Sequence, residues 1–188
     1  MKPGTRFSLF VILLFCGSAF GQDLRDFRVL ATNKTSTMEK ELNEAATAGF
    51  RFEGTMGGES AFGGKEVVVV MSRPKGEAVP AKYSYKLLAA NRTGTMQKEL
   101  QAAGDAGFEY KGQTVFQTTF GGQEVVVILE RDRDKPIRRV EYKLLATQRT
   151  STMEKELQQA GEAGFVFVGL TVAETAFGGK EVVTILRK

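Results

Sequence analysis

The sequence predicts an α+β fold of three tandem β-α-β-β repeats, each a three-stranded mixed sheet with strand order 1-3-2 and one helix on one face, and with the sheets packed on one another. Three observations predict this fold. A 47-residue pattern occurs three times, at residues 27–73, 85–131 and 142–188, and all three copies agree at 19 positions without a gap. Apolar spacing within each copy changes from strand-like to helical and back. Each copy also ends on a strand that is apolar on both faces, so a further layer must cover it.

Each repeat begins with a short apolar strand that is followed by a helix. In the second copy the strand is residues 85–89, and Met96, Leu100, Ala103 and Ala106 then share one face of a helix. Serine and glutamate three residues apart predict a capping box at the first and third helix starts, and glycines predict the helix ends. The capping pairs are Ser36 with Glu39 and Ser151 with Glu154, and the terminating glycines are Gly49, Gly107 and Gly164.

Two further strands complete each repeat. A glycine interrupts the second strand and predicts a bulge, and a Gly-Gly pair predicts the hairpin turn to the third strand. A right-handed crossover makes strands one and two parallel, and the third strand, the most apolar, is expected between them. Its free face is expected to contact the sheet of another repeat or another molecule. The bulge glycines are Gly54, Gly112 and Gly169, the turns are residues 63–64, 121–122 and 178–179, and the third strands are residues 66–71, 124–129 and 181–186.

Residues 1–21 have the pattern of a signal peptide for export. A positive start, a short apolar run and small residues before the expected cleavage near Gly21 are typical of such signals. The apolar run is about half of the roughly 20 residues that a membrane-spanning helix needs, so no transmembrane segment is expected. We expect location in the periplasm or outside the cell. Lipid attachment at Cys16 is the alternative, and the bulky Phe15 directly before the cysteine argues against it.

Composition narrows the classes of function. Polar, proline-bearing segments at residues 74–84 and 132–141 are expected to link the repeats. Residues 1–21 contain two cations and no carboxylate, so without them the net charge falls from +4 to +2, which argues against a nucleic-acid partner. The rest of the chain has no cysteine, histidine or tryptophan. It therefore lacks thiols, imidazoles and the soft ligands that zinc prefers, and no cofactor or metal is expected.

Two stretches in each repeat carry a resemblance to a known family. They are Tyr85-Lys86-Leu87-Leu88 with residues 100–108 and Tyr142-Lys143-Leu144-Leu145 with residues 157–165, while the first copy keeps Leu42-Asn43 and Gly49-Phe50. These stretches resemble short bacterial domains of unknown function with a Tyr-Lys-x-x strand and a helix ending Leu-Asn-x-x-Gly-x-x-Gly-Trp. Here Phe replaces Trp, and three units follow an export signal. The resemblance implies a β-α-β-β fold and no particular activity.

A cation and a threonine precede each predicted helix and form the first candidate site. Free N–H groups at a helix start, hydroxyls and a cation are the ingredients of an anion or small-ligand site. The alternative is that the hydroxyls cap the helix while the cation is solvated, since the helix dipole does not favour a cation at that end. The residues are Lys34 and Thr35, Arg92 and Thr93, and Arg149 and Thr150.

The phenylalanine before each Gly-Gly turn is the second candidate. These side chains are expected to pack across the hairpin, and the alternative is an exposed patch that binds a partner. The residues are Phe62, Phe120 and Phe177.

Recurring carboxylates offer the remaining route to catalysis, at Glu66, Glu124 and Glu181 in the strands and at Glu41, Glu99 and Glu156 in the helices. Nothing in their spacing marks two of them as neighbours in contrasting environments. We therefore expect an exported, non-enzymatic repeat protein that acts in binding or scaffolding, through a protein partner or through self-association of a sheet face. Binding of an anion or small ligand is the alternative, and a carboxylate-based hydrolase comes third.

Overall fold

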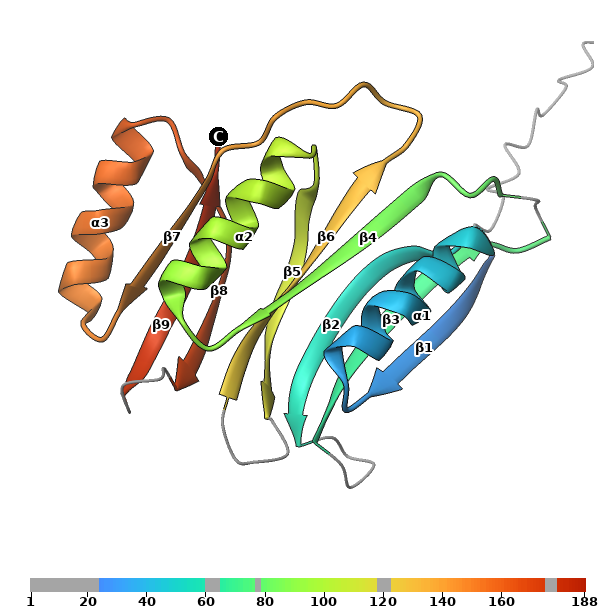
Figure 1. The fold of residues 1–188 in the computed structure, drawn as a ribbon, viewed down its shortest axis with the longest axis horizontal. Helices are drawn as coiled ribbons and strands as arrows, with labels where there is room; N and C mark the ends of the chain where they lie inside the picture. The colour runs from blue at the N-terminus through green and yellow to red at the C-terminus, as the bar shows by residue number, and fades with distance from the viewer. Residues whose placement is uncertain (1–23, 60–64, 77–78, 118–122, 175–178) are drawn as a thin grey trace, which may run out of the picture.

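The three repeats lie side by side in chain order, each as a small sheet with one helix (Figure 1). The structure is a computed structural model that describes residues 24–59, 65–76, 79–117, 123–174 and 179–188. The predicted signal segment and the Gly-Gly turns, apart from Gly179, lie outside these residues. The elements of the first repeat are β1 (Arg25–Thr32), α1 (Thr35–Thr47), β2 (Arg51–Glu59) and β3 (Lys65–Pro74). Those of the second are β4 (Tyr83–Ala90), α2 (Thr93–Asp105), β5 (Glu109–Gln117) and β6 (Gln123–Asp132), and those of the third are β7 (Tyr142–Thr147), α3 (Thr150–Glu162), β8 (Val166–Glu174) and β9 (Lys180–Arg187).

Each repeat has the predicted strand order, with its last strand in the centre. The orders are β1-β3-β2, β4-β6-β5 and β7-β9-β8. The description of the sheets as mixed was wrong, because every hydrogen-bonded pair is antiparallel. The two outer strands run in the same direction, as the crossover requires, but the central strand separates them. The central strand needs cover on both faces because its successive apolar side chains point to opposite sides.

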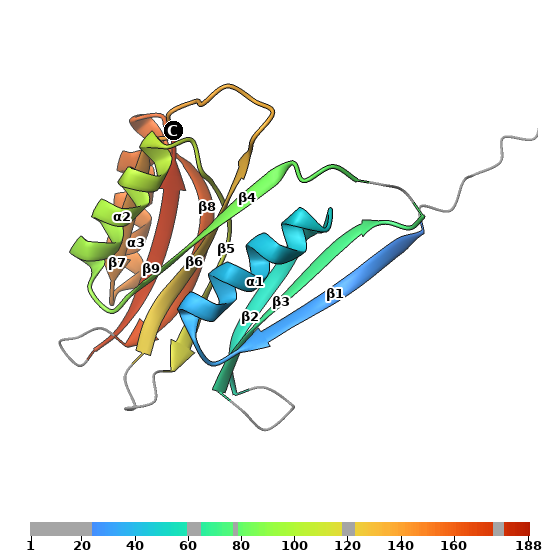
Figure 2. The same ribbon diagram turned by 45° about the vertical axis from the view of Figure 1, so that its right-hand side comes forward.

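The helix of one repeat packs against the first strand of the next. Helix α1 contacts β4 and α2 contacts β7, while β2 contacts β5 and β5 contacts β8. Neighbouring sheets therefore approach closely at their second strands, and a helix fills the wider side between them (Figure 2). The predicted packing of sheet on sheet is thus present along one edge, and elsewhere a helix lies between the sheets.

This arrangement gives neighbouring repeats a shared hydrophobic core. Met38 and Leu42 of α1 are fully buried, and they pack with Val126 and Ile128 of β6 in the second repeat. A second core joins α2 and the other face of β6 to Val183 and its neighbours on β9. The free face of each central strand in repeats two and three is therefore covered by the preceding repeat. A smaller cluster around Leu145, Ala160 and Leu186 belongs to the third repeat alone. Because the two larger cores are shared between neighbours, the repeats are expected to unfold together.

Helix ends follow the prediction at one terminus only. Gly49, Gly107 and Gly164 have φ between 77° and 85°, the left-handed conformation that ends a helix. The predicted capping box is wrong for the first helix. This helix begins at Thr35, its N-cap residue is Lys34, and no side chain caps it. The Glu39 carboxylate instead accepts a hydrogen bond from the next repeat. The third helix likewise has Arg149 as its N-cap and no side-chain cap, so the pair Ser151 and Glu154 does not form a box either.

Polar side chains on each internal helix hold the outer edge of the following strand. The Asn43 amide accepts a hydrogen bond from Tyr85 N at 2.9 Å and donates to Tyr85 O at 2.9 Å. Glu39 accepts from Leu87 N at 2.8 Å. At the second boundary Gln101 accepts from Tyr142 N at 3.0 Å, and Gln97 accepts from Leu144 N at 2.7 Å. Side chains of the preceding helix thus satisfy an edge strand that would otherwise expose unpaired backbone groups.

An aromatic ring of one repeat lies over a glycine of the next. The register shifts at Gly54, Gly112 and Gly169, as predicted for bulges. A Cβ atom on Gly112 would lie 3.0 Å from the Phe52 ring, and one on Gly169 would overlap the hydroxyl of Tyr110. The two glycines therefore make room for the ring that the preceding repeat supplies.

Two equivalent glycines in the helices are expected to respond oppositely to alanine. In Gly104→Ala the new methyl group would overlap Val140 O and lie 2.9 Å from the Tyr142 ring, whereas Gly161 has open space at its Cβ position. We expect Gly161→Ala to raise the free energy of unfolding by up to about 1 kcal/mol through helix propensity. Gly104→Ala is expected to lower it by about 1–3 kcal/mol through overpacking. Urea unfolding followed by circular dichroism measures both, and equal shifts would contradict this packing.

Candidate functional site

The cations that the sequence singled out lie at the helix starts but do not form one site. Lys34, Arg92 and Arg149 are the N-cap residues of the three helices, and all three are exposed. Thr35 and Arg92 line separate pockets that have no residue in common. The structure therefore brings each cation to its helix start, together with its threonine, and leaves the three pairs apart. Thr93 and Thr150 begin the second and third helices. Whether these segments bind an anion stays a prediction.

The second candidate from the sequence, the patch of Phe62, Phe120 and Phe177, lies outside the described residues. The recurring glutamates of the third strands, Glu66, Glu124 and Glu181, are half-buried. No cluster of three or more aspartate, glutamate, histidine or cysteine residues that could hold a metal ion occurs in the described part of the chain. None of its helices is long and apolar enough to cross a membrane.

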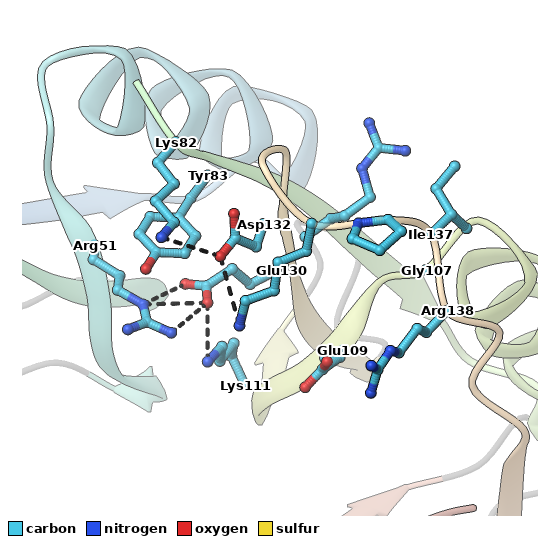
Figure 3. Close-up of a pocket in the computed structure, with 13 residues that line it drawn as sticks. Arg51, Lys82, Tyr83, Gly107, Glu109, Lys111, Glu130, Asp132, Ile137 and Arg138 are labelled. Atoms are coloured by element: carbon cyan, nitrogen blue, oxygen red, sulfur yellow. Dashed lines mark hydrogen bonds and ion pairs between the residues drawn. The ribbon is translucent and has the colours of Figure 1, made fainter. Parts of the chain in front are cut away.

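A polar pocket of about 400 Å³ lies where the first and second repeats meet the linkers that follow them (Figure 3). Its wall carries six cationic and three acidic side chains, so the pocket has an excess of positive charge. The cations come from β2, β5, β6 and both linkers. They are Arg51, Lys82, Lys111, Arg131, Lys135 and Arg138, and the acids are Glu109, Glu130 and Asp132.

A buried carboxylate is among the residues that line this pocket. The Glu130 side chain is only 4% exposed, and it forms ion pairs with Arg51 and Lys111 at 2.9 Å each. It also accepts a hydrogen bond of 2.7 Å from the hydroxyl of Tyr85, which in turn accepts one from Phe52 N at 2.9 Å. Because Arg51 and Phe52 belong to the first repeat and Glu130 to the second, this network joins the two.

Electrostatics keep this carboxylate charged. Burial raises the pKa of Glu130, but hydrogen bonds from Arg51, Tyr85 and Lys111 outweigh burial, and the net pKa lies below its ordinary value. The pKa of Tyr85 is raised, first by burial and then by the charge of Glu130. Glu130 is therefore ionised and fully paired at neutral pH. A general acid needs the opposite, a carboxyl whose pKa is raised toward neutrality.

The third repeat exposes an apolar face at the open end of the stack. Phe167, Leu170 and Val172 of β8 lie on the helix side of the third sheet, and each is about half exposed. Val166, which pairs with Arg187, is also exposed, but on the other face of this sheet. The equivalent positions of the second repeat, in the order of Phe167, Leu170 and Val172, are Tyr110, Gln113 and Val115. Those residues lie at the boundary with the third repeat, where the chain supplies a cover.

At the other end of the stack, the first repeat exposes apolar side chains on the face of its sheet that has no helix. Phe27 and Val29 of β1 lie opposite Ser72 and Val70, on the side of the first sheet that faces away from α1. Phe27 is 66% and Val29 61% exposed, and Met56 of β2 is also exposed. The equivalent faces of the second and third sheets are covered by the preceding repeat. Among the described residues, apolar surface is thus concentrated at the two ends of the stack.

Comparisons with known proteins place the chain in no family: no family model, no curated protein and no solved structure matches it. The resemblance to short bacterial domains of unknown function therefore stays a prediction. By its fold, the protein is a stack of three α+β repeats.

Sequence reasoning missed the residues that join the repeats. Asn43 and Gln101 occupy the same position of successive repeats, and both carry amides on a helix. The signal in the sequence was an amide side chain that recurs at the same helix position. Its meaning depends on the strand that lies opposite, which only the three-dimensional packing supplies. The network around Glu130 had no such signal, because the equivalent residues are Ser72 and Arg187.

Proposed function

We propose that this protein is an exported, non-enzymatic scaffold that binds a protein partner through the apolar face of its third repeat. One observation carries the proposal. The end of a repeat stack is usually covered by a polar repeat that keeps the protein soluble, whereas here Phe167, Leu170 and Val172 are exposed. Contiguous apolar surface of this kind is typical of interaction sites. The charge and apolar run of residues 1–21 support export.

The absence of an enzymatic role is part of the proposal and is supported by the environment of the most buried carboxylate. Glu130 is ionised and held by two cations and a tyrosine hydroxyl. That arrangement stabilises the boundary between repeats and leaves no proton for transfer at neutral pH.

Crosslinking in the producing cell tests the proposal. A photo-reactive amino acid at position 170 is expected to give an adduct, whereas one at Lys98, an exposed position on α2, is the matched control. The mass of the adduct identifies the partner, and cell fractionation shows whether the protein and adduct are exported. If position 170 gives no adduct above the Lys98 control, the proposed binding face is wrong.

Anion binding is the second candidate, and the excess of cations around the pocket at Glu130 favours it. Glu130 and Asp132 already neutralise some of these cations, Asp132 through Lys82 at 3.3 Å. Titration with inorganic phosphate tests the two possible locations. Loss of binding in Arg131→Ala with Arg138→Ala assigns the site to the pocket. Loss in the combined variant of Lys34, Arg92 and Arg149 to alanine assigns it to the helix starts.

A further inference from the structure

We propose that the chain assembles head to tail with further copies of itself, the third repeat of one copy binding the open face of the first repeat of the next. The inference deepens the proposed function, because it names a second copy of this chain as the partner of the same apolar face. It rests on the two boundaries inside the chain, which use the same contacts. Both ends of the chain display one half of that boundary.

The first shared contact is the ring over the glycine. Phe52 lies over Gly112 and Tyr110 over Gly169. The next ring in this series is Phe167, which is 52% exposed. The glycine that precedes the series is Gly54, and apart from its two chain neighbours the described structure places no atom within 4 Å of its Cβ position. The third repeat therefore presents a ring without a glycine, and the first presents a glycine without a ring.

The second shared contact is the hydrogen bonding of a helix to the next edge strand. The third helix carries Glu154 and Gln158 at the positions of Gln97 and Gln101, and both side chains are exposed. In the first repeat the outer edge of β1 presents the same backbone positions as β4, at Phe27 and Val29. No side chain among the described residues hydrogen-bonds to this edge of Phe27 or Val29. Gln158 has both the donor and the acceptor that Phe27 requires, and Glu154 has the acceptor that Val29 N requires.

The third shared contact is apolar. Val126 and Ile128 of the second sheet pack on the preceding repeat, and the equivalent residues of the first sheet are Val68 and Val70, flanked by the exposed Phe27 and Val29. The opposing face of the third repeat is the most apolar of the three. Leu170 stands where the first and second repeats have Thr55 and Gln113, and Val172 where they have Gly57 and Val115. An exposed end that is more apolar than its buried equivalents is the reverse of a solubilising cap.

Charge also fits this pairing. At the first boundary Arg51 pairs with Glu130, and at the second Glu109 pairs with Arg187 at 3.1 Å. The corresponding pair between two copies is Val166 with Ser72, which buries no charge without a partner. The Ser72 hydroxyl already donates to Glu53 and accepts from Arg25 within its own repeat. The cation lies in the preceding repeat at the first boundary and in the following repeat at the second, so the two ion pairs distinguish the boundaries. The corresponding positions at the two ends of the chain carry no charge.

A head-to-tail contact joins two different surfaces, so each bound copy leaves one end free to bind again. Such an interface produces a ring if the rotation between copies closes, and an open filament otherwise. A symmetric dimer would instead place one face against its own copy. This difference makes the polarity of the assembly measurable.

Gly54→Leu is the sharpest single test. Its Cβ position is open and its φ is not in the left-handed region, so the isolated chain is expected to keep its melting temperature. The side chain would fill the place of the incoming Phe167 ring, and we expect self-association to weaken at least about tenfold in analytical ultracentrifugation. Gly94→Leu, another position with open space, is the control and should associate as the wild type does. Equal association of wild type and Gly54→Leu would overturn the proposal.

Mixing two blocked variants tests the polarity. Leu170→Lys with Val172→Lys blocks the third repeat, and Phe27→Lys with Val29→Lys blocks the first. Each variant alone should be monomeric, and a 1:1 mixture should stop at a dimer because one intact pair of faces remains. A dimer formed by one blocked variant alone would indicate a symmetric contact and overturn the proposal.

A wild type that stays monomeric at every concentration would also overturn it. That outcome leaves the proposed function standing if the crosslink at position 170 joins a different protein. The exported protein, with its N-terminus verified by mass spectrometry, is the material for these measurements.

Discussion

Leu100→Ala is expected to lower the free energy of unfolding by about 3–5 kcal/mol, as for other leucines whose removal leaves a cavity in a packed core. Leu100 is fully buried on α2, between its own sheet and the third repeat. The helix is fixed on both sides, so the surrounding residues have little freedom to close the cavity. Urea unfolding followed by circular dichroism measures the change in the free energy of unfolding. An unchanged m-value, the slope of this free energy against urea concentration, shows that the folded state stays compact.

Leu157→Ala is the matched control for this prediction. Leu157 has the same position in α3, but it is only half-buried because no fourth layer covers the helix among the described residues. We expect a loss of about 1–2 kcal/mol, since less apolar surface is removed from the core. The measurement is made at a concentration at which the chain is monomeric. Equal losses in the two variants would contradict the account in which each helix is held by the following repeat.

The strand order and the bulges were predictable from sequence because local chemistry determines them. The valine run of β3 is apolar at consecutive positions, which places it in the centre of a sheet, and glycine at Gly112 marks the bulge directly. The prediction of mixed sheets was wrong because the two outer strands run in the same direction but do not hydrogen-bond to each other. The capping box failed in both helices because each begins one residue before the predicted cap serine, with Lys34 and Arg149 as the N-cap residues. In the first helix Glu39 instead hydrogen-bonds to Leu87 N, a partner 48 residues away that a short-range motif cannot indicate.

The site itself was less predictable than the fold. The sequence singled out what recurs, such as Lys34 and its equivalents, for which anion binding stays a prediction. The groups that stand out in three dimensions are those that differ between repeats: Glu130, where the other copies have Ser72 and Arg187, and Leu170, where they have Thr55 and Gln113. An alignment of the copies shows these differences. It does not show which of the positions lies at a boundary and which lies at an open end.

Glu130→Gln is expected to lower the free energy of unfolding by about 2–4 kcal/mol at pH 7, because it removes the charge that balances Arg51 and Lys111. The amide keeps an acceptor for the Tyr85 hydroxyl, so the change isolates the charge from the hydrogen bond. The partial exposure of Arg51 and Lys111, at 46% and 27%, allows water to compensate in part. Thermal unfolding and urea unfolding at pH 7 measure the loss.

Arg187→Gln provides the control, since it breaks the corresponding ion pair at the second boundary. Arg187 and Glu109 are both exposed, at 37% and 58%, and such pairs contribute less than about 1 kcal/mol. A loss from Arg187→Gln as large as that from Glu130→Gln would show that burial of the carboxylate is not what makes the first boundary strong.

The stability difference between the wild type and Glu130→Gln is expected to depend on pH. The folded-state pKa of Glu130 lies below its ordinary value of 4.5, so its charge stabilises the fold fully above that pH, and the contribution is lost as the pH falls through the folded-state pKa. The stability difference between wild type and Glu130→Gln should therefore be constant near neutrality and shrink below about pH 4.5. A difference that instead grows on acidification would mean that the folded protein holds Glu130 as the neutral acid, and that Arg51 and Lys111 do not govern its ionisation.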